Sequence, residues 1–201
     1  MVRHFSKRRS IRTIWLFCEG EKTEKNYFEK LRSEERIRQI CIKVKSPTRK
    51  HPAGMVQEAI EFKKSSANFF AEDEIFCIFD RDMNTDQQIA SAVKLAKDND
   101  IKLIFSNPCF EYWILCHFEK NNSACEIDTI ISKLKRYLGE YEKNDREIYL
   151  KTHARRNEAI KNAKEAVGYH KKLGIEFFSR KSNPSTNVHA LIEYLISIKS
   201  E

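Results

Sequence analysis

Three acidic residues follow apolar runs at positions where they could bind a divalent cation. The run 75–79 leads into Asp80 and Asp82, and the earlier run 14–18 leads into Glu19. In an extended chain, residues i and i+2 project to the same side, roughly 6–7 Å apart, so both aspartates can reach one ion. Magnesium prefers oxygen ligands and keeps several waters. The pattern therefore predicts a Mg²⁺ or Mn²⁺ site with Glu19, Asp80 and Asp82 as ligands.

The chemistry expected of such a site is phosphodiester hydrolysis. A bound cation polarises a phosphodiester oxygen and lowers the pKa of an attacking water. Glu19 either completes the metal site or acts through a bound water as a general base. Glu24 is a second catalytic candidate, with the alternative that it is only a favourable acid in the first turn of a helix. Glu111, after the Ser-Asn-Pro turn 106–108, is the third.

The elements that must position these acids alternate along the first half of the chain. Strands are predicted at 13–18, 40–44, 75–79 and 101–105, helices at 21–35, 55–69 and 86–98, and a loop at 46–54. A β-α-β-α-β-α-β series forms a parallel sheet with helices on both faces. Ligands bind at the carboxyl ends of such strands, where Glu19, Asp80 and Asp82 fall. This agreement favours a site over the alternative that the aspartates only form a turn.

The second half of the chain is predicted to be mostly helical. Helices are expected at 110–118, 127–138, 155–172 and 188–198, and the segment 140–152 is ambiguous. We expect the aromatic residues Phe110, Tyr112 and Trp113 either to stack on nucleic-acid bases or, as is more common at helical spacing, to belong to the core. We expect a single domain over residues 1–201, with an α/β core at about 11–118 and a helical extension at about 119–201.

Composition narrows the functional classes. The 201 residues are 41% hydrophobic and 33% charged, and no apolar run approaches the roughly 18 residues of a membrane span. The six cysteines form no C-x-x-C pair, so we expect reduced thiols. The basic N-terminus is not followed by the apolar segment of a signal peptide. These features predict a cytoplasmic protein that does not enter a membrane.

The net charge of +8 favours a polyanionic partner. Several basic clusters fall in expected loops, which a nucleic-acid backbone can approach. The alternative is ordinary surface basicity, since many basic proteins bind no nucleic acid. The residues predicted to contact DNA or RNA are Lys22, Arg49, Lys50, Arg81, Arg155 and Arg156.

Four fragments in this order, 18–24, 79–82, 106–113 and 183–188, resemble the RloB family. The resemblance implies a Toprim-like four-stranded, mainly parallel sheet flanked by helices. It also implies a metal-dependent nuclease of restriction or abortive-infection loci with an ATPase partner. Toprim proteins place a glutamate after the first strand, matching Glu19, and D-x-D after the third, matching Asp80 and Asp82. The glycine that often follows D-x-D is replaced here by Met83 and Asn84.

Two functional hypotheses remain open. The leading one is a magnesium-dependent nuclease in antiviral defence. The alternative is a non-catalytic nucleic-acid-binding or regulatory subunit of an ATPase-containing complex. A receiver or phosphatase of the haloacid type fits poorly, because the latter needs D-x-D after the first strand, where this chain has Cys18-Glu19-Gly20.

Overall fold

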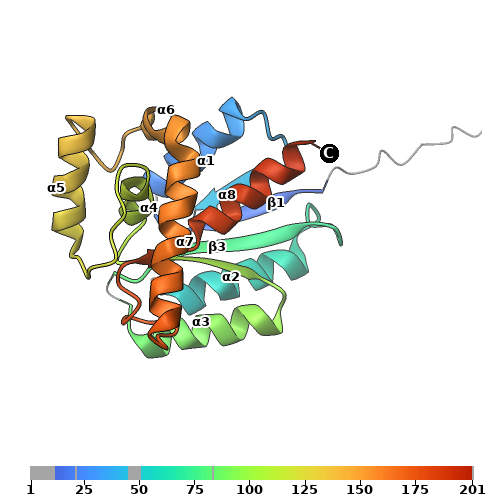
Figure 1. Cartoon of the computed structure of the whole chain (residues 1–201). Coiled ribbons are helices and arrows are strands. Elements are labelled where there is room, and N and C mark those ends of the chain that lie inside the picture. The colour runs from blue at the N-terminus through green and yellow to red at the C-terminus, as the bar shows by residue number, and fades with distance from the viewer. Residues whose placement is uncertain (1–11, 21, 45–50, 83, 201) are drawn as a thin grey trace, which may run out of the picture.

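One mixed sheet lies between two layers of helices (Figure 1). The computed structural model describes residues 12–20, 22–44, 51–82 and 84–200. The strands are β1 (Ile14–Cys18), β2 (Ile40–Val44), β3 (Glu74–Asp80), β4 (Lys102–Asn107) and β5 (Ser185–Thr186). Their order is β2-β1-β3-β4-β5; the first four run parallel, and β5 pairs antiparallel with β4. The predicted β-α-β series and parallel sheet are confirmed.

The helices divide between the two faces of the sheet. They are α1 (Thr23–Glu34), α2 (Pro52–Ser65), α3 (Asp86–Asp98), α4 (Glu111–Cys116), α5 (Ile127–Leu138), α6 (Ile148–Thr152), α7 (Arg156–Lys172) and α8 (Val188–Ser197), with short 3-10 turns η1 (His153–Arg155) and η2 (Ile198–Ser200). In Figure 1, α2 and α3 lie below the sheet, and α1, α7 and α8 lie on its other side.

Alternation along the strands explains why both faces are covered. In β1, Leu16 belongs to the core cluster shared with α1 and the C-terminal helices, whereas Phe17 belongs to the cluster under α2 and α3. Every residue of β1 is buried. A strand buried on both sides reads as a continuous apolar run, which is how 14–18 and 75–79 appear in the sequence.

The C-terminal half packs into the same core as the sheet. Ile114 of α4, Leu134 of α5, Ala163 of α7 and Leu191 of α8 share one buried cluster with Leu16 of β1. The aromatic side chains of Phe110, Tyr112 and Trp113 are also buried in that cluster. They are therefore core residues and present no face to a nucleic-acid base.

Three expectations about element boundaries need correction. The sheet has five strands instead of four, because the polar pair Ser185–Thr186, which resembles a helix cap, pairs with the end of β4. Residues 52–54 are helical where a loop was expected. Pro52 occupies the first turn, where its missing N–H costs nothing, and His51 accepts a hydrogen bond from the Gly54 N–H. The second helix ends at Ser65, before Phe69.

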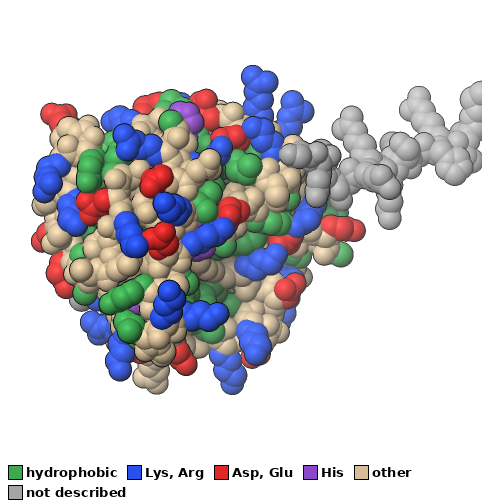
Figure 2. Space-filling model, in the orientation of Figure 1, with side chains coloured by type: hydrophobic (Ala, Val, Ile, Leu, Met, Phe, Trp, Pro, Cys, Tyr) green, Lys and Arg blue, Asp and Glu red, His purple; other side chains and the backbone are tan. Residues whose placement is uncertain are grey.

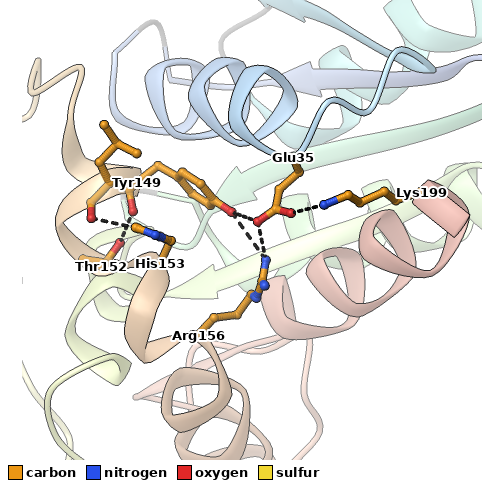
Figure 3. Close-up of polar contacts among 7 residues, drawn as sticks. Glu35, Tyr149, Thr152, His153, Arg156 and Lys199 are labelled. Atoms are coloured by element: carbon orange, nitrogen blue, oxygen red, sulfur yellow. Dashed lines mark hydrogen bonds and ion pairs between the residues drawn. The ribbon is translucent and has the colours of Figure 1, made fainter.

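A polar cluster joins the end of α1 to α6, α7 and the C-terminal turn η2 (Figure 3). Glu35 accepts hydrogen bonds from the Tyr149 hydroxyl at 2.6 Å and from Arg156 Nη1 at 2.8 Å, both at Oε1. Lys199 Nζ donates to the other carboxylate oxygen at 2.8 Å. One carboxylate thus joins α1, α6, α7 and the C-terminal turn. Burial alone would raise the Glu35 pKa, but the three donors lower it to about 2.

Two further features of the described residues bear on the sequence predictions. None of the helices is long and apolar enough to cross a membrane. All six cysteines are free thiols, and every one except Cys41 is buried. Burial raises the pKa of the Cys77 thiol well above its ordinary value, which keeps it protonated and unreactive.

Candidate metal and nucleic-acid site

A pocket of about 400 Å³ opens at the carboxyl ends of β1 and β3. Acidic residues dominate its lining, and two lysines join them. The residues that line it are Glu19, Gly20, Lys22, Thr23, Glu24, Asp80, Asp82, Asn84, Glu111 and Lys143. All five acids predicted from the sequence are therefore brought together in one pocket, at the edge of the sheet where ligands bind.

Glu19 and Asp80 lie beside each other because β1 and β3 are neighbouring parallel strands. The Asp80 N–H donates to Glu19 Oε2 at 3.2 Å, and the Glu19 N–H donates to the Ile78 carbonyl at 2.9 Å. Asp80 itself is partly exposed, but its Oδ1 is shielded from solvent and has no hydrogen-bond partner among the described residues. A buried carboxylate oxygen without a donor is costly unless a cation or proton satisfies it.

Glu24 reaches the pocket from the first turn of α1. Its side chain is buried, and its carboxylate lies against Gly20 so closely that a Cβ atom at position 20 would overlap it. Glycine at position 20 therefore makes room for the Glu24 carboxylate between β1 and α1. Glu24 is thus an acid in the first turn of α1 and also lines the pocket, and its catalytic role stays a prediction.

Glu111 is buried at the start of α4 and is held from two sides. Its Oε1 accepts hydrogen bonds from the Thr23 hydroxyl and from the Tyr141 hydroxyl, each at 3.1 Å. Thr23 also lies 2.9 Å from the Lys143 carbonyl. These contacts fix α4, the start of α1 and the loop between α5 and α6 around one carboxylate.

Asp82 lies in the pocket for a different reason than the strand spacing suggested. β3 ends at Asp80, and Asp82 follows with φ +26°, outside the extended conformation. The expectation that alternation along an extended strand brings Asp80 and Asp82 together is therefore wrong; a turn does so instead. The Asp82 N–H donates to the Pro108 carbonyl at 3.1 Å, and Asn84 Nδ2 donates to the Asp80 carbonyl at 2.9 Å.

Burial and mutual repulsion disfavour the ionised forms of Glu24 and Asp80 in the pocket. Burial raises the Glu24 pKa to about 7, and the charges of Glu111 and Glu19 act in the same direction, against a backbone hydrogen bond that lowers it. Burial, followed by the charges of Glu24 and Glu111, also raises the pKa of Asp80 well above its usual range. The charge of Glu111 raises the pKa of Lys143 in turn. The pocket therefore favours a bound proton or cation.

The donor chemistry of this pocket fits a hard divalent cation. Its candidate ligands are carboxylate oxygens, one of which, Asp80 Oδ1, is buried without a donor. As the described residues stand, no three His, Cys, Asp or Glu side chains are gathered closely enough to hold a metal ion. Like-charged carboxylates repel one another, so a cation that keeps several waters would have to draw them together.

The structure divides the predicted basic residues into two groups. Lys22 lines the pocket, and Arg81 adjoins it, donating from Nη1 to the Asp82 carbonyl at 2.9 Å. Arg156 instead pairs with Glu35, one α1 length from Thr23, which is about 18 Å for this helix. Its neighbour Arg155 lies over the Phe118 ring at 5.5 Å. Arg49 and Lys50 lie outside the described residues.

Sequence reasoning missed several residues of the site, among them Thr23, which in the sequence indicates only the start of a helix. Lys143 and Tyr141 come from the ambiguous segment 140–152, and nothing in their local pattern signals a return to the pocket. Asn84 follows D-x-D in a region where Toprim proteins often have a glycine, which by itself indicates no role. Its position four residues after Asp80, within reach of the same turn, is the one available signal.

The fold and the pocket define a mixed α/β protein with a carboxylate site at the carboxyl edge of a parallel sheet. A family model described as RloB-like protein matches residues 14–195, and the chain belongs to that family. The match covers β1 through most of α8 and so includes every pocket residue. No curated protein and no solved structure matches the chain significantly.

Proposed function

We propose that this protein is a Mg²⁺- or Mn²⁺-dependent nuclease that hydrolyses nucleic-acid phosphodiesters. The observation that carries the proposal is the convergence of Glu19, Glu24, Asp80 and Glu111 on one pocket of a chain with net charge +8. Buried acids with raised pKa values cluster at functional sites more often than in ordinary surfaces. A positively charged protein with such an acidic pocket suits a polyanion whose phosphate approaches through a cation.

The residues of the pocket suggest distinct roles. Glu19, Asp80 and Asp82 would hold the cation, which when bound supplies charge neutralisation and a more acidic water. Glu111 is oriented by the hydroxyls of Thr23 and Tyr141, as required of a group that positions a water or accepts its proton. Glu24, with a pKa of about 7, is suited to exchange a proton near neutral pH.

Lys22 and Lys143 line the pocket beside these acids. Ammonium groups at these positions would contact the phosphates of a bound strand and limit repulsion between the strand and the carboxylates. The Toprim resemblance supports the same assignment of Glu19, Asp80 and Asp82. The resemblance to RloB proteins implies a role in antiviral defence together with an ATPase partner, and we include both in the proposal.

A cleavage assay with the purified protein tests the proposal. Labelled single- and double-stranded DNA and RNA are incubated with Mg²⁺ or Mn²⁺, or with EDTA, for the wild type and Asp80→Asn. We expect metal-dependent cleavage of at least one substrate and a reduction of about 100-fold or more in the variant. The reduction is large because a cation ligand stabilises charge that develops in the transition state.

The matched control is Asp98→Asn, an exposed aspartate at the end of α3. It makes the same chemical change away from the pocket and should cleave like the wild type. Equal activity in Asp80→Asn, or a wild type that cleaves none of these substrates with or without a co-purified partner, would rule out the catalytic assignment.

A second function is favoured by one specific observation: among the described residues, the acids are not gathered for metal binding. A nucleic-acid-binding or regulatory subunit of an ATPase-containing complex needs no such assembly. Manganese binding by isothermal titration separates the two functions. If the site is catalytic, the wild type should bind Mn²⁺ and Asp80→Asn should not. A regulatory subunit should bind nucleic acid in the absence of Mn²⁺.

A further inference from the structure

The turn between α7 and β5 is fastened to the carboxyl edge of the sheet, next to the acidic pocket. Asn107, the last residue of β4, donates from Nδ2 to the carbonyls of Ser179 at 3.0 Å and Arg180 at 3.2 Å. The Arg180 N–H donates to Asp86 Oδ1 at 2.7 Å, at the start of α3. In Figure 1 this red loop lies beside the beginning of α3. The turn is thus held from two elements.

Aromatic side chains of the same turn pack against β4. Phe177 and Phe178 each pack on Phe105 of β4, with ring centroids 5.7 Å apart. The buried hydroxyl of Ser182 lies within hydrogen-bond distance of the carbonyls of Phe177 and Ser179, at 2.6 and 2.9 Å. These contacts hold the backbone of the turn in place, and the side chains of Arg180 and Lys181 are exposed to solvent.

Arg180 and Lys181 carry charge that no acid of the described residues offsets, as do Lys171 and Lys172 at the end of α7. All four are exposed, and no ion pair to any of them is found within the described part of the chain. On α7 and its neighbours, by contrast, Lys164 pairs with Glu193 and Lys120 pairs with Glu165. Figure 2 shows the resulting mixture of blue and red side chains over that face. What sets Arg180 and Lys181 apart from Lys171 and Lys172 is the attachment of their backbone to Asn107 of β4 and Asp86 of α3.

The turn continues the edge that carries the acids. Asp80 is in register with Ser106 on β4, and Asn107, which holds the turn, is the next residue. Neighbouring strands are about 4.8 Å apart, so the turn begins one strand beyond Asp80 along the sheet. Lys22 and Lys143 line the pocket on the α1 side. A polyanion crossing the pocket would thus meet cations on both sides of the carboxylates.

We propose that Arg180 and Lys181 form a phosphate-binding extension of the pocket, which holds a nucleic-acid strand after it crosses β4 toward α3. This inference rests on the proposed function, since it takes a nucleic acid as the ligand. Arginine and lysine on a fixed turn contact phosphates without reading bases. The extension therefore contributes affinity and positioning, but no sequence preference.

The test compares two double variants of equal charge. Arg180→Ala/Lys181→Ala removes the extension, and Lys171→Ala/Lys172→Ala removes two exposed lysines from the end of α7. Both are placed in the Asp80→Asn background, and binding of short labelled single-stranded DNA and RNA is followed by anisotropy in EDTA at several salt concentrations. For the turn variant we expect affinity to fall about tenfold relative to the control. The slope of log K against log salt should shrink by about 0.7 for each phosphate that the variant no longer neutralises.

The outcomes separate this inference from the nuclease assignment. Equal reductions in the two double variants, or no binding of either oligonucleotide by the parent protein, would overturn the extension. A conservative exchange, Arg180→Lys/Lys181→Arg, should restore most of the affinity and shows that the turn still folds. If the turn variant alone loses binding while the wild type never cleaves, the extension stands and the nuclease assignment fails. If the wild type cleaves and the turn variant binds like its control, the reverse holds.

Discussion

At the scale of single residues, all five predicted acids line the pocket, but strand order gives the physical reason for only some of them. Glu19 and Asp80 end neighbouring strands, so their contact follows from the β-α-β pattern alone. Asp82 also lines the pocket, but through a left-handed residue conformation that strand periodicity does not foresee. Lys143 lies 32 positions after Glu111, and only the packed structure brings the two together.

The raised pKa of Asp80 leads to a prediction for the metal-free protein. When the pKa of a carboxyl group is higher in the folded protein than in the unfolded chain, the folded protein becomes less stable as the pH rises above the unfolded pKa. The reason is that the group ionises more readily in the unfolded chain than in its buried position. At neutral pH, Asp80→Asn removes that cost and leaves no charge on the shielded oxygen. We expect the variant to be more stable than the wild type in EDTA by about 1 kcal/mol, which is roughly 2–4 °C for a chain of this size.

Differential scanning fluorimetry with and without Mn²⁺ measures both halves of this prediction. Manganese should raise the melting temperature of the wild type and leave that of Asp80→Asn unchanged, since ligands stabilise only the state that binds them. Asp98→Asn serves again as the control, with no change in EDTA and a normal response to Mn²⁺. A destabilised Asp80→Asn protein in EDTA would contradict the argument from buried charge.

At the scale of elements, amphipathic and apolar periodicity located α1, α3, α5 and the four parallel strands. It failed where an element is short or polar. β5 has two residues, both polar, and is a strand only because β4 offers it an edge. The loop between α5 and α6 shows no periodicity, yet it supplies Tyr141 and Lys143 to the pocket. The contacts that place such segments are tertiary, and no local pattern encodes them.

Thr23 joins three of these elements and provides the test at this scale. Its buried hydroxyl lies within hydrogen-bond distance of Glu111 Oε1 on α4 and of the Lys143 carbonyl in the loop. Thr23→Val keeps the shape but removes the donor. We expect a decrease of about 1–2 kcal/mol in the free energy of unfolding, because buried acceptors lose a partner. Any metal-dependent cleavage should decline as well, because Glu111 is less firmly oriented.

Urea denaturation and the cleavage assay measure the two effects. Thr23→Ser is the matched control: it retains the hydroxyl and loses only a methyl group, so it should recover most of the activity. If valine and serine at position 23 reduce activity equally, the methyl packing of Thr23 matters and its hydrogen bonds do not.

At the scale of the whole molecule, one carboxylate joins segments that are far apart in the sequence. Glu35 is separated from Tyr149, Arg156 and Lys199 by 114, 121 and 164 positions, yet it accepts hydrogen bonds from all three (Figure 3). The sequence predicts Arg156 as a nucleic-acid contact because it lies in a basic cluster. In the fold its guanidinium binds Glu35, and a pairing over such separations depends on how α1 and α7 pack.

This cluster predicts how stability depends on pH. The folded pKa of Glu35 is about 2, below the ordinary value of 4.5, so its contribution is fully present above about pH 4.5 and is lost as the pH falls toward 2. Glu35→Gln removes the charge but keeps an acceptor. We expect the variant to be less stable at neutral pH by on the order of 2 kcal/mol, since one pKa unit corresponds to about 1.4 kcal/mol and partly exposed partners weaken the effect. The difference from the wild type should shrink steadily between about pH 4.5 and 2.

Urea unfolding of both proteins at a series of pH values measures this difference, and taking the difference cancels the titration of groups that both share. Glu34→Gln is the control one residue away, where an exposed glutamate faces Lys30 at 3.4 Å. Exposed pairs contribute little, so this variant should follow the wild type at every pH. A constant difference between Glu35→Gln and the wild type down to pH 2 would mean that the hydrogen bonds of Glu35, and not its charge, hold α1 to the C-terminal helices.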